Sequence, residues 1–260
     1  MKKELNEQDI KAAVLEKIRD RLTAQDAVLV NEMVFGSGNR RADLVLVNGH
    51  IQAFEVKSDF DTLRRLSGQL NDYLSRFDKL TLVVSSRYVR QALESDERVG
   101  VWEALSVKDK VVIRVRRVGR IQSISNPDAV CDFMLKSELV SFLRSRRILV
   151  DYKVADRERL IELCALAPVS SIRKEAIACV KARYSELSSS FLSQCSDVVV
   201  LGDLERLSRS KAKRRQLEKE LDWNKPRPSS GRPREINLSR FFPDGDIPDT
   251  IPRHVLVPVL

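Results

Sequence analysis

Residues 40–57, RRADLVLVNGHIQAFEVK, constrain the fold more than any other stretch of the chain. Two apolar runs of strand length flank an Asn-Gly pair, which is a strong hairpin signal. Asp43, Glu55 and Lys57 lie inside these runs, where an unpaired charge is costly to bury. Because Glu55 and Lys57 are two residues apart, both side chains leave the same face of a strand. The hairpin is therefore expected to gather charges at one place on a buried sheet.

The register of this hairpin decides whether Asp43 joins the other two charges. A two-residue Asn-Gly loop would pair Asp43 with Phe54 and turn it away from Glu55, since a one-residue slip reverses the facing. A three-residue loop over residues 47–49 with Gly49 left-handed, or a bulge, would put both carboxylates on one face. We expect this odd offset. Carboxylates that close raise each other's pKa or need a cation, and Mg²⁺ prefers carboxylate oxygen while keeping several waters.

Hydrophobic periodicity in the first half of the chain predicts an α/β fold with the order helix, three strands, helix, strand. We expect an amphipathic helix over residues 6–22 capped by Asn6, a strand over 28–35, the 41–57 hairpin, a helix from the Ser58–Asp61 capping box to about residue 77, and a strand over 80–84. Asp59 and Asp61 are assigned to helix capping. Residues 99–104 and 111–118 are expected to extend the sheet as short strands.

The second half of the chain has a different character. Helices are expected over residues 128–147, 156–166 and 170–195, the last interrupted by a serine cluster at 188–190. Residues 206–240 hold twelve Arg or Lys against four Asp or Glu, and seven of the nine prolines follow Asn224. Such a basic tail is expected to be partly disordered and to sit on phosphates, although a solvated linker or a partner-docking arm explains it equally well.

Residues 1–120 resemble the PD-(D/E)XK nuclease superfamily, which includes restriction endonucleases, Holliday-junction resolvases and RecB-type nucleases. Asp43 matches the first acid, after Ala42 in place of the usual proline, and Glu55-Val56-Lys57 matches the (D/E)XK tripeptide. Residues 69–73 fit the QxxxY pattern of the RecB and lambda-exonuclease branch. The resemblance implies a restriction-endonuclease-like αβββαβ core with a mixed sheet. We expect this nuclease-like domain at 1–120, a helical region at 125–200 and the basic, Pro-rich tail at 201–260.

The resemblance also implies roles for individual residues. Mg²⁺ or Mn²⁺ would be held by Asp43, Glu55 and the carbonyl of Val56, with Lys57 orienting or deprotonating the attacking water. Further site residues expected are Glu32 as a third acid on the first strand, Gln69 and Tyr73 contacting phosphate or orienting the site, and Arg65, with its neighbour Arg64, holding the nucleic acid. All of these except Gln69 have a plainer explanation: a surface strand residue for Glu32, core packing for Tyr73 and solvated helix charges for the arginines. Glu7 on the first helix is another place for an acid.

Composition narrows the chemistry. The chain has only two histidines, which argues against His-based zinc sites and against Ser-His-Asp or Cys-His catalysis. Its four cysteines form no CxxC pair and are expected to be buried thiols in a reducing cytoplasm. No stretch approaches the ~20 apolar residues of a membrane span, and the polar N-terminus is unlike a signal peptide. We therefore expect a cytoplasmic protein without membrane contact.

The sequence thus predicts a metal-dependent, Mg²⁺-using (endo)nuclease that hydrolyses phosphodiester bonds of DNA. The alternative is a catalytically inactive protein of nuclease fold that binds nucleic acid or a protein partner. A transcription regulator acting through the helices of residues 128–195 is a third reading, although these helices carry no recognition-helix signature. The C-terminal region could also mediate a homodimer or bind a protein partner.

Overall fold

A six-stranded mixed sheet organises Met1–Trp223, the larger of two compact units in the computed structural model. The strands lie in sequence order: β1 (Val28–Phe35), β2 (Arg40–Val47), β3 (Ile51–Lys57), β4 (Lys79–Ser85), β5 (Gly100–Val107) and β6 (Lys110–Arg117). β1 to β3 form an antiparallel meander, β3, β4 and β5 run parallel, and β6 returns antiparallel to β5. The structure describes residues 4–23, 27–35, 40–64, 66–108, 110–148, 151, 155–194, 204, 207, 231–235 and 254–258.

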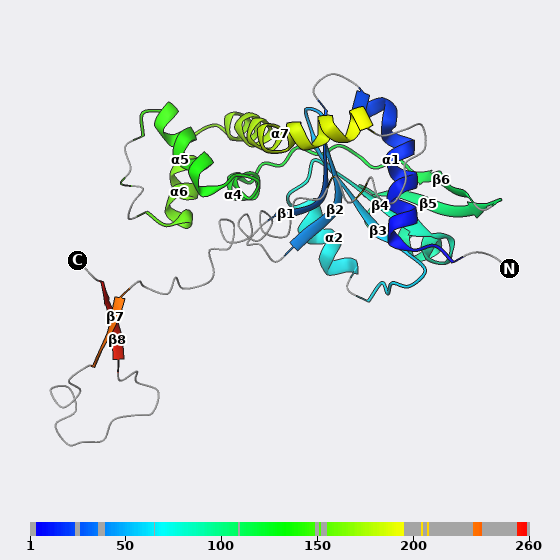
Figure 1. Cartoon of the computed structure of the whole chain (residues 1–260), viewed down its shortest axis with the longest axis horizontal. Helices are drawn as coiled ribbons and strands as arrows, with labels where there is room; N and C mark the ends of the chain where they lie inside the picture. Colours follow the sequence, from blue (N-terminus) through cyan, green and yellow to red (C-terminus); the bar gives the residue numbers. More distant parts are fainter. Residues whose placement is uncertain are drawn as a thin grey trace, which may run out of the picture. The chain divides into compact units, whose positions relative to one another are not determined.

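Helices cover both faces of this sheet (Figure 1). They are α1 (Glu7–Thr23), α2 (Leu66–Leu74), α3 (Val89–Leu93), α4 (Pro127–Cys131), α5 (Lys136–Ser145), α6 (Arg157–Cys164) and α7 (Val169–Gln194), with a 3₁₀ turn, η1, at Ser86–Tyr88. One core lies between the sheet and α1, where Ile10 and Ile18 pack with Phe54 and Trp102. The other core lies on the opposite face and joins the sheet to α2 and α4–α7. The nuclease-like part predicted for 1–120 and the helical region predicted for 125–200 thus belong to one compact unit.

The smaller unit, Asn224–Leu260, contains two paired strands, β7 (Gly231–Glu235) and β8 (His254–Pro258). They run antiparallel, with Pro233 opposite Leu256. We expected partial disorder in this tail, and within it the structure describes these two strands. Phe241 and Phe242, which follow β7 in the sequence, lie outside the described residues.

Several predicted elements are confirmed. The structure is α/β with a mixed sheet, β1 spans the predicted 28–35, and β4 to β6 lie within three residues of their predicted positions. Asn6 caps α1, because its Oδ1 accepts a hydrogen bond from the Asp9 amide at 2.8 Å. Local signals were sufficient here because apolar runs bounded by turns and a capped amphipathic stretch agree with the tertiary environment.

The helix predicted to begin at Ser58 is wrong: α2 begins at Leu66. The capping-type contacts are present, because the Ser58 amide and hydroxyl both donate to Asp61 Oδ2, at 2.8 and 2.6 Å. However, Asp59 is bound elsewhere, since its amide donates to the Leu5 carbonyl at 3.1 Å and its Oδ2 accepts from the Leu5 amide at 2.8 Å. This tie to the N-terminal segment replaces the first helical turn with a loop.

The helices of the second half also differ from prediction. The expected helix over 128–147 is broken into α4 and α5, because Phe133 and Met134 are buried in the core between them and Glu138 caps a new start at the Leu135 amide. The expected interruption of α7 at its serine cluster does not occur. Ser188 is buried, and its Oγ accepts a hydrogen bond from the Leu29 amide of β1 at 3.0 Å. Its small side chain allows the helix to continue against the strand.

The meander contains one irregularity that bears on the site. In β1, Val30 and Met33 face the same core although they are three residues apart, and Glu32 between them has a positive φ of 55°. In β2, Ala42 and Val45 likewise face that core across Asp43. Since successive side chains of a regular strand alternate, both strands change facing at this point. The pairing register is the same before and after it, so the two strands turn over together.

Candidate functional site

The β2–β3 hairpin brings the predicted acids together. Val47 pairs with Ile51 and Leu44 with Phe54, so the loop consists of the three residues between Val47 and Ile51, with Gly49 at a positive φ of 97°. The predicted odd offset is confirmed, although the loop lies one residue further along the chain than expected. Extending this register by one pair puts Asp43 across from Glu55, as the site requires.

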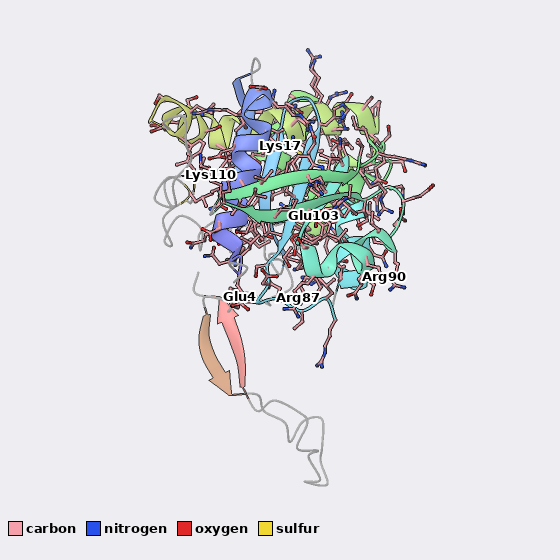
Figure 2. All side chains as sticks on the ribbon, turned by 90° about the vertical axis from the view of Figure 1, so that its right-hand side faces the viewer. Glu4, Lys17, Arg87, Arg90, Glu103 and Lys110 are labelled. Atoms are coloured by element: carbon pink, nitrogen blue, oxygen red, sulfur yellow. The ribbon has the colours of Figure 1, made fainter. Side chains whose placement is uncertain are left out.

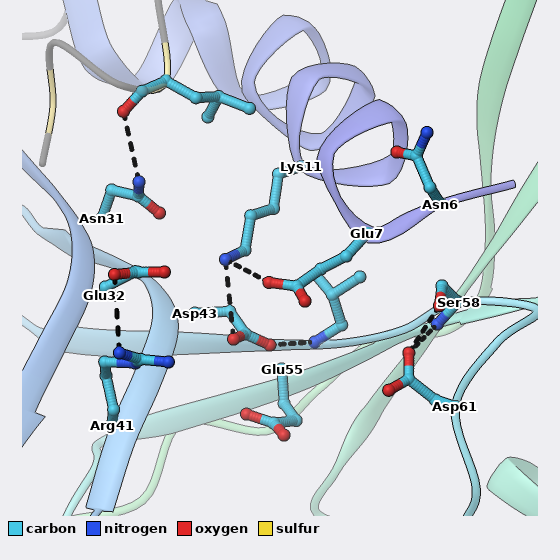
Figure 3. A network of polar contacts seen from close by, with 12 residues as sticks. Asn6, Glu7, Lys11, Asn31, Glu32, Arg41, Asp43, Glu55, Ser58 and Asp61 are labelled. Atoms are coloured by element: carbon cyan, nitrogen blue, oxygen red, sulfur yellow. Dashed lines mark hydrogen bonds and ion pairs between the residues drawn. The ribbon is translucent and has the colours of Figure 1, made fainter. Parts of the chain in front are cut away.

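Asp43 belongs to β2, and its side chain contacts Lys11 of α1 and the backbone of β3 (Figure 3). Its Oδ2 accepts a hydrogen bond from the Val56 amide at 2.7 Å, and its Oδ1 lies 3.6 Å from Lys11 Nζ. Burial, followed by the Glu55 charge, raises the pKa of Asp43 to about 7, against the opposing effects of Lys11 and the Val56 amide. Burial and the neighbouring Glu55 charge together therefore disfavour the ionised form of this carboxyl group more than Lys11 and the Val56 amide favour it.

Glu55 is nearly fully buried and holds two partners, one on each oxygen. Its Oε1 lies 2.7 Å from Lys57 Nζ, and its Oε2 accepts a hydrogen bond from the Tyr73 hydroxyl at 2.5 Å. Burial by itself would lower the pKa of Lys57, but the Glu55 carboxylate beside it outweighs this effect and the pKa is raised. In this arrangement Lys57 is a cation, not a base.

Tyr73 fixes Glu55 from α2. Its ring is 2% exposed and packs against Phe35 and Phe77, with centroid distances of 5.2 and 5.4 Å. Its hydroxyl lies 3.0 Å from the Arg41 carbonyl as well as close to Glu55, and burial and the Glu55 charge raise its pKa. Of the two roles that the resemblance implies, this position favours orienting the site. Gln69, one turn earlier on α2, is half-buried.

Lys11 is a site residue that the sequence reasoning missed. Its side chain is 5% exposed, and its Nζ lies 2.5 Å from Glu7 Oε1 as well as 3.6 Å from Asp43. The i,i+4 spacing of Glu7 and Lys11 beside the apolar face of α1 is a signal that could have indicated it. The cluster therefore contains three acids and two lysines: Glu7, Asp43, Glu55, Lys11 and Lys57.

The other predicted site residues, Glu32, Arg64, Arg65 and Val56, differ in how the structure places them. Glu32 falls opposite Asp43 when the β1–β2 register is extended, and its Oε2 lies 3.6 Å from Arg41 Nη1. Arg64 is exposed, and Arg65 lies outside the described residues. Val56 enters the site through its amide, which is bound to Asp43. Among the residues that the structure describes, no group of three or more His, Cys, Asp or Glu is arranged to hold a metal ion.

The fold and this cluster define a class: an α/β protein that buries an acid–lysine group at the meander of a mixed sheet. The chain belongs to the family described as Bacteriophage P4 protein cII, whose model matches residues 1–208. Protein cII of Enterobacteria phage P4 is 36% identical over 220 residues, which cover 83% of this chain and 82% of that protein. The matched family region contains the whole sheet of the larger unit and helices α1 to α7.

A solved structure, the SPO1766 protein of unknown function from Silicibacter pomeroyi, is 16% identical with a TM-score of 0.35, covering 57% of this chain and 93% of that one. None of the helices that the structure describes is long and apolar enough to cross a bilayer.

Proposed function

We propose that the protein is a metal-dependent nuclease that hydrolyses phosphodiester bonds of DNA through Asp43, Glu55 and Lys57. The observation that carries this proposal is the position of Asp43 beside Glu55 on paired strands, with Lys57 2.7 Å from Glu55. The element order α1, β1, β2, β3, α2, β4 supports it, because it is the αβββαβ order that the resemblance to the PD-(D/E)XK nucleases implies.

The donor set suits Mg²⁺ or Mn²⁺. The cluster contains three acids against two lysines, and burial followed by the Glu55 charge raises the pKa of Asp43, so a cation at this place would favour the ionised form of its carboxyl group. Mg²⁺ typically takes one or two protein carboxylates and completes its shell with waters and phosphate oxygens, so Asp43 and Glu55 would suffice to hold it. Bound there, such an ion would lower the pKa of a coordinated water and polarise the phosphate.

The chain's own side chains would divide the remaining work. Lys57, held as a cation by Glu55, would offset phosphate charge and orient the water. Tyr73 would keep the Glu55 carboxylate in one orientation through its 2.5 Å hydrogen bond. Lys11 would hold Asp43 in place before the ion enters and would compete with it afterwards.

A second function has a specific observation in its favour. Asp43 and Glu55 each already have a lysine within ion-pair distance. A site whose acids are compensated in this way also suits an inactive protein of nuclease fold that binds nucleic acid or a protein partner. The decisive measurement is therefore cleavage together with cation binding.

The test uses the purified full chain with supercoiled plasmid DNA and Mg²⁺ or Mn²⁺. Asp43→Ala and Lys57→Ala are each expected to reduce nicking by about 10²-fold or more, the usual cost of losing a group that acts on the reacting centre. Glu94→Gln, which alters an exposed acid 3.8 Å from Arg90, is the matched control and should nick at the wild-type rate. Undiminished nicking by the two site variants would refute the proposal.

Cation binding separates the two functions. In a calorimetric Mn²⁺ titration, Asp43→Asn should weaken binding, and Lys11→Met should strengthen it because the competing ammonium is gone. If the wild-type protein binds DNA but does not bind Mn²⁺ and does not cut DNA, the protein is the inactive binder instead.

A further inference from the structure

The two edges of the sheet are treated differently. At the β1 edge the Leu29 amide donates to Ser188 of α7, and Asn31 Nδ2 donates to the Leu204 carbonyl at 3.2 Å. This edge is therefore covered by other parts of the same unit. At the other end of the sheet order, β6 pairs with β5 alone within the described part of the chain. An uncovered edge strand presents N–H and C=O groups on which another strand can pair.

The hairpin register identifies the backbone groups that point outward. Val107 pairs with Lys110 across a two-residue connection, which makes this a hydrogen-bonded pair. Hydrogen-bonded and non-hydrogen-bonded pairs alternate along an antiparallel ladder. Val112 and Arg114 therefore bond inward to β5, and the N–H and C=O groups of Val111, Ile113 and Val115 face away from the sheet.

The side chains along this edge are apolar and basic. Val107, Val112 and Val115 are 49%, 45% and 40% exposed, which is high for large hydrophobic residues on a strand pair. Lys110 and Arg114 are exposed and have no acidic partner among the described residues. Figure 2 shows Lys110 on the β5–β6 hairpin, with Glu103 further along it.

The other two arginines of β6 are already bound. Arg116 Nη2 lies 2.5 Å from Glu103 Oε2, and Arg117 Nε donates to the Val99 carbonyl at 2.8 Å. The charge left over for a partner therefore lies at Lys110 and Arg114, on the face that also carries Val112.

These charges argue against a second copy of the chain as the partner. Antiparallel pairing of two β6 strands centred on Val112 would put Lys110 opposite Arg114, and pairing centred on Arg114 would put that residue opposite itself. Like charges directly opposite one another destabilise a strand pair, whereas opposite charges stabilise it. An acidic strand is the complementary occupant.

We propose that β6 is a docking edge for an extended acidic segment of a partner protein, which adds as a seventh strand to the sheet. The segment bonds to the outward groups of Val111, Ile113 and Val115, and its acids pair with Lys110 and Arg114. Main-chain bonds give such strand addition its affinity and side chains give it selectivity. This surface is independent of the acid–lysine cluster and of the nuclease proposal.

The test measures binding of a fluorescent peptide to the full-length protein by polarisation. The probe has eight residues of alternating Glu and Val, matching the length of β6, and a Lys–Val peptide is its counterpart. The Glu–Val peptide should bind and the Lys–Val peptide should not. Val115→Pro removes one outward N–H without breaking the ladder to β5 and should weaken binding about tenfold. Val118→Pro, just beyond the strand, is the matched control and should bind normally.

Charge reversal gives a second measurement that does not depend on a proline. In the Lys110→Glu/Arg114→Glu double variant, the preference should move to the Lys–Val peptide. Glu–Val binding that withstands both changes would overturn the proposal. So would a dimer in sedimentation that Val115→Pro abolishes, since the edge would then serve a second copy. Displacement of the peptide by duplex DNA would assign the edge to nucleic acid and overturn it as well.

Discussion

At the scale of single residues, the cluster is a balance between charge and burial. Asp43 is the member whose ionised form is disfavoured, because burial and the Glu55 charge together outweigh the effects of Lys11 and the Val56 amide. Glu55 and Lys57 instead stabilise one another, since Lys57 Nζ lies 2.7 Å from Glu55 Oε1, and Tyr73 donates a hydrogen bond to the other oxygen of Glu55. Because the pKa of Asp43 differs between the folded and the unfolded protein, the free energy of unfolding depends on pH.

The direction of this dependence follows from proton binding. In the folded protein Asp43 keeps its proton up to about pH 7, whereas in the unfolded chain it loses it near its ordinary pKa of 3.8. The unfolded state thus binds fewer protons in this range, and the free energy of unfolding falls as pH rises from about 4 to 7. The difference between these two pKa values corresponds to at most about 4 kcal/mol in the free energy of unfolding.

We expect Asp43→Asn to remove most of this decline, so that the variant is more stable than the wild type near neutral pH and above. Urea unfolding at about pH 5 and about pH 8, with divalent cations chelated, measures it. Asp96→Asn is the control, because Asp96 has its pKa lowered to about 2 by hydrogen bonds from Arg98 and should leave the decline in place. An equal decline in Asp43→Asn would contradict the assignment.

The grouping of Asp43, Glu55 and Lys57 was predictable because strand alternation and loop parity are local properties of the sequence. Lys11 was not, since its contact with Asp43 depends on how α1 packs across the sheet. Tyr73 was foreseen as a position on a helical face, but its bond to Glu55 required the tertiary structure.

At the scale of elements, the strands were more predictable than the helices. Apolar runs bounded by turn residues are sufficient to specify β1 to β6. The segment after Ser58 carries a helix-start pattern, yet the contacts of Asp59 with Leu5 overrule it. The serine cluster of α7 resembles a break, yet one serine is a hydrogen-bond acceptor for the neighbouring strand.

That contact between α7 and β1 can be tested directly. Ser188→Ala leaves the buried Leu29 amide without its acceptor and should lower the free energy of unfolding by about 1–3 kcal/mol. Ser189→Ala removes the hydroxyl of the neighbouring exposed serine and should be neutral or slightly stabilising, since alanine favours helix. Chemical denaturation of both variants gives the comparison. Equal stabilities would mean that the contact contributes little.

At the scale of the whole molecule, the change of composition near residue 125 does not divide the core. Phe77 of the first half packs against Phe133 of the second, with ring centroids 5.1 Å apart. Asp78, the residue before β4, accepts two hydrogen bonds from Arg173 of α7, at 3.1 and 2.8 Å. Composition reports the local character of a segment, and the shared core could be read only from the packed structure.

Truncation tests whether the first folding unit ends near residue 120, as composition suggests, or at residue 223, as the packed structure has it. A fragment of residues 1–223 should fold and unfold in one cooperative thermal transition, because it keeps both faces of the sheet covered. A fragment of residues 1–120 should be insoluble or lack such a transition, since it exposes the core face that α4 to α7 cover. Circular dichroism during heating measures both. A cooperative 1–120 fragment would show that the sheet is a domain by itself.

The shared reversal at Glu32 and Asp43 limits how this chain can change its length over evolution. Losing one residue from either strand alone would turn the side chains of half of that strand to the opposite face of the sheet, while those of its neighbour kept their facing. Losing one from each would restore an ordinary ladder. Relatives that shorten the meander should therefore do so by paired deletions, and those that keep the acid of β2 should also keep the irregular position in β1.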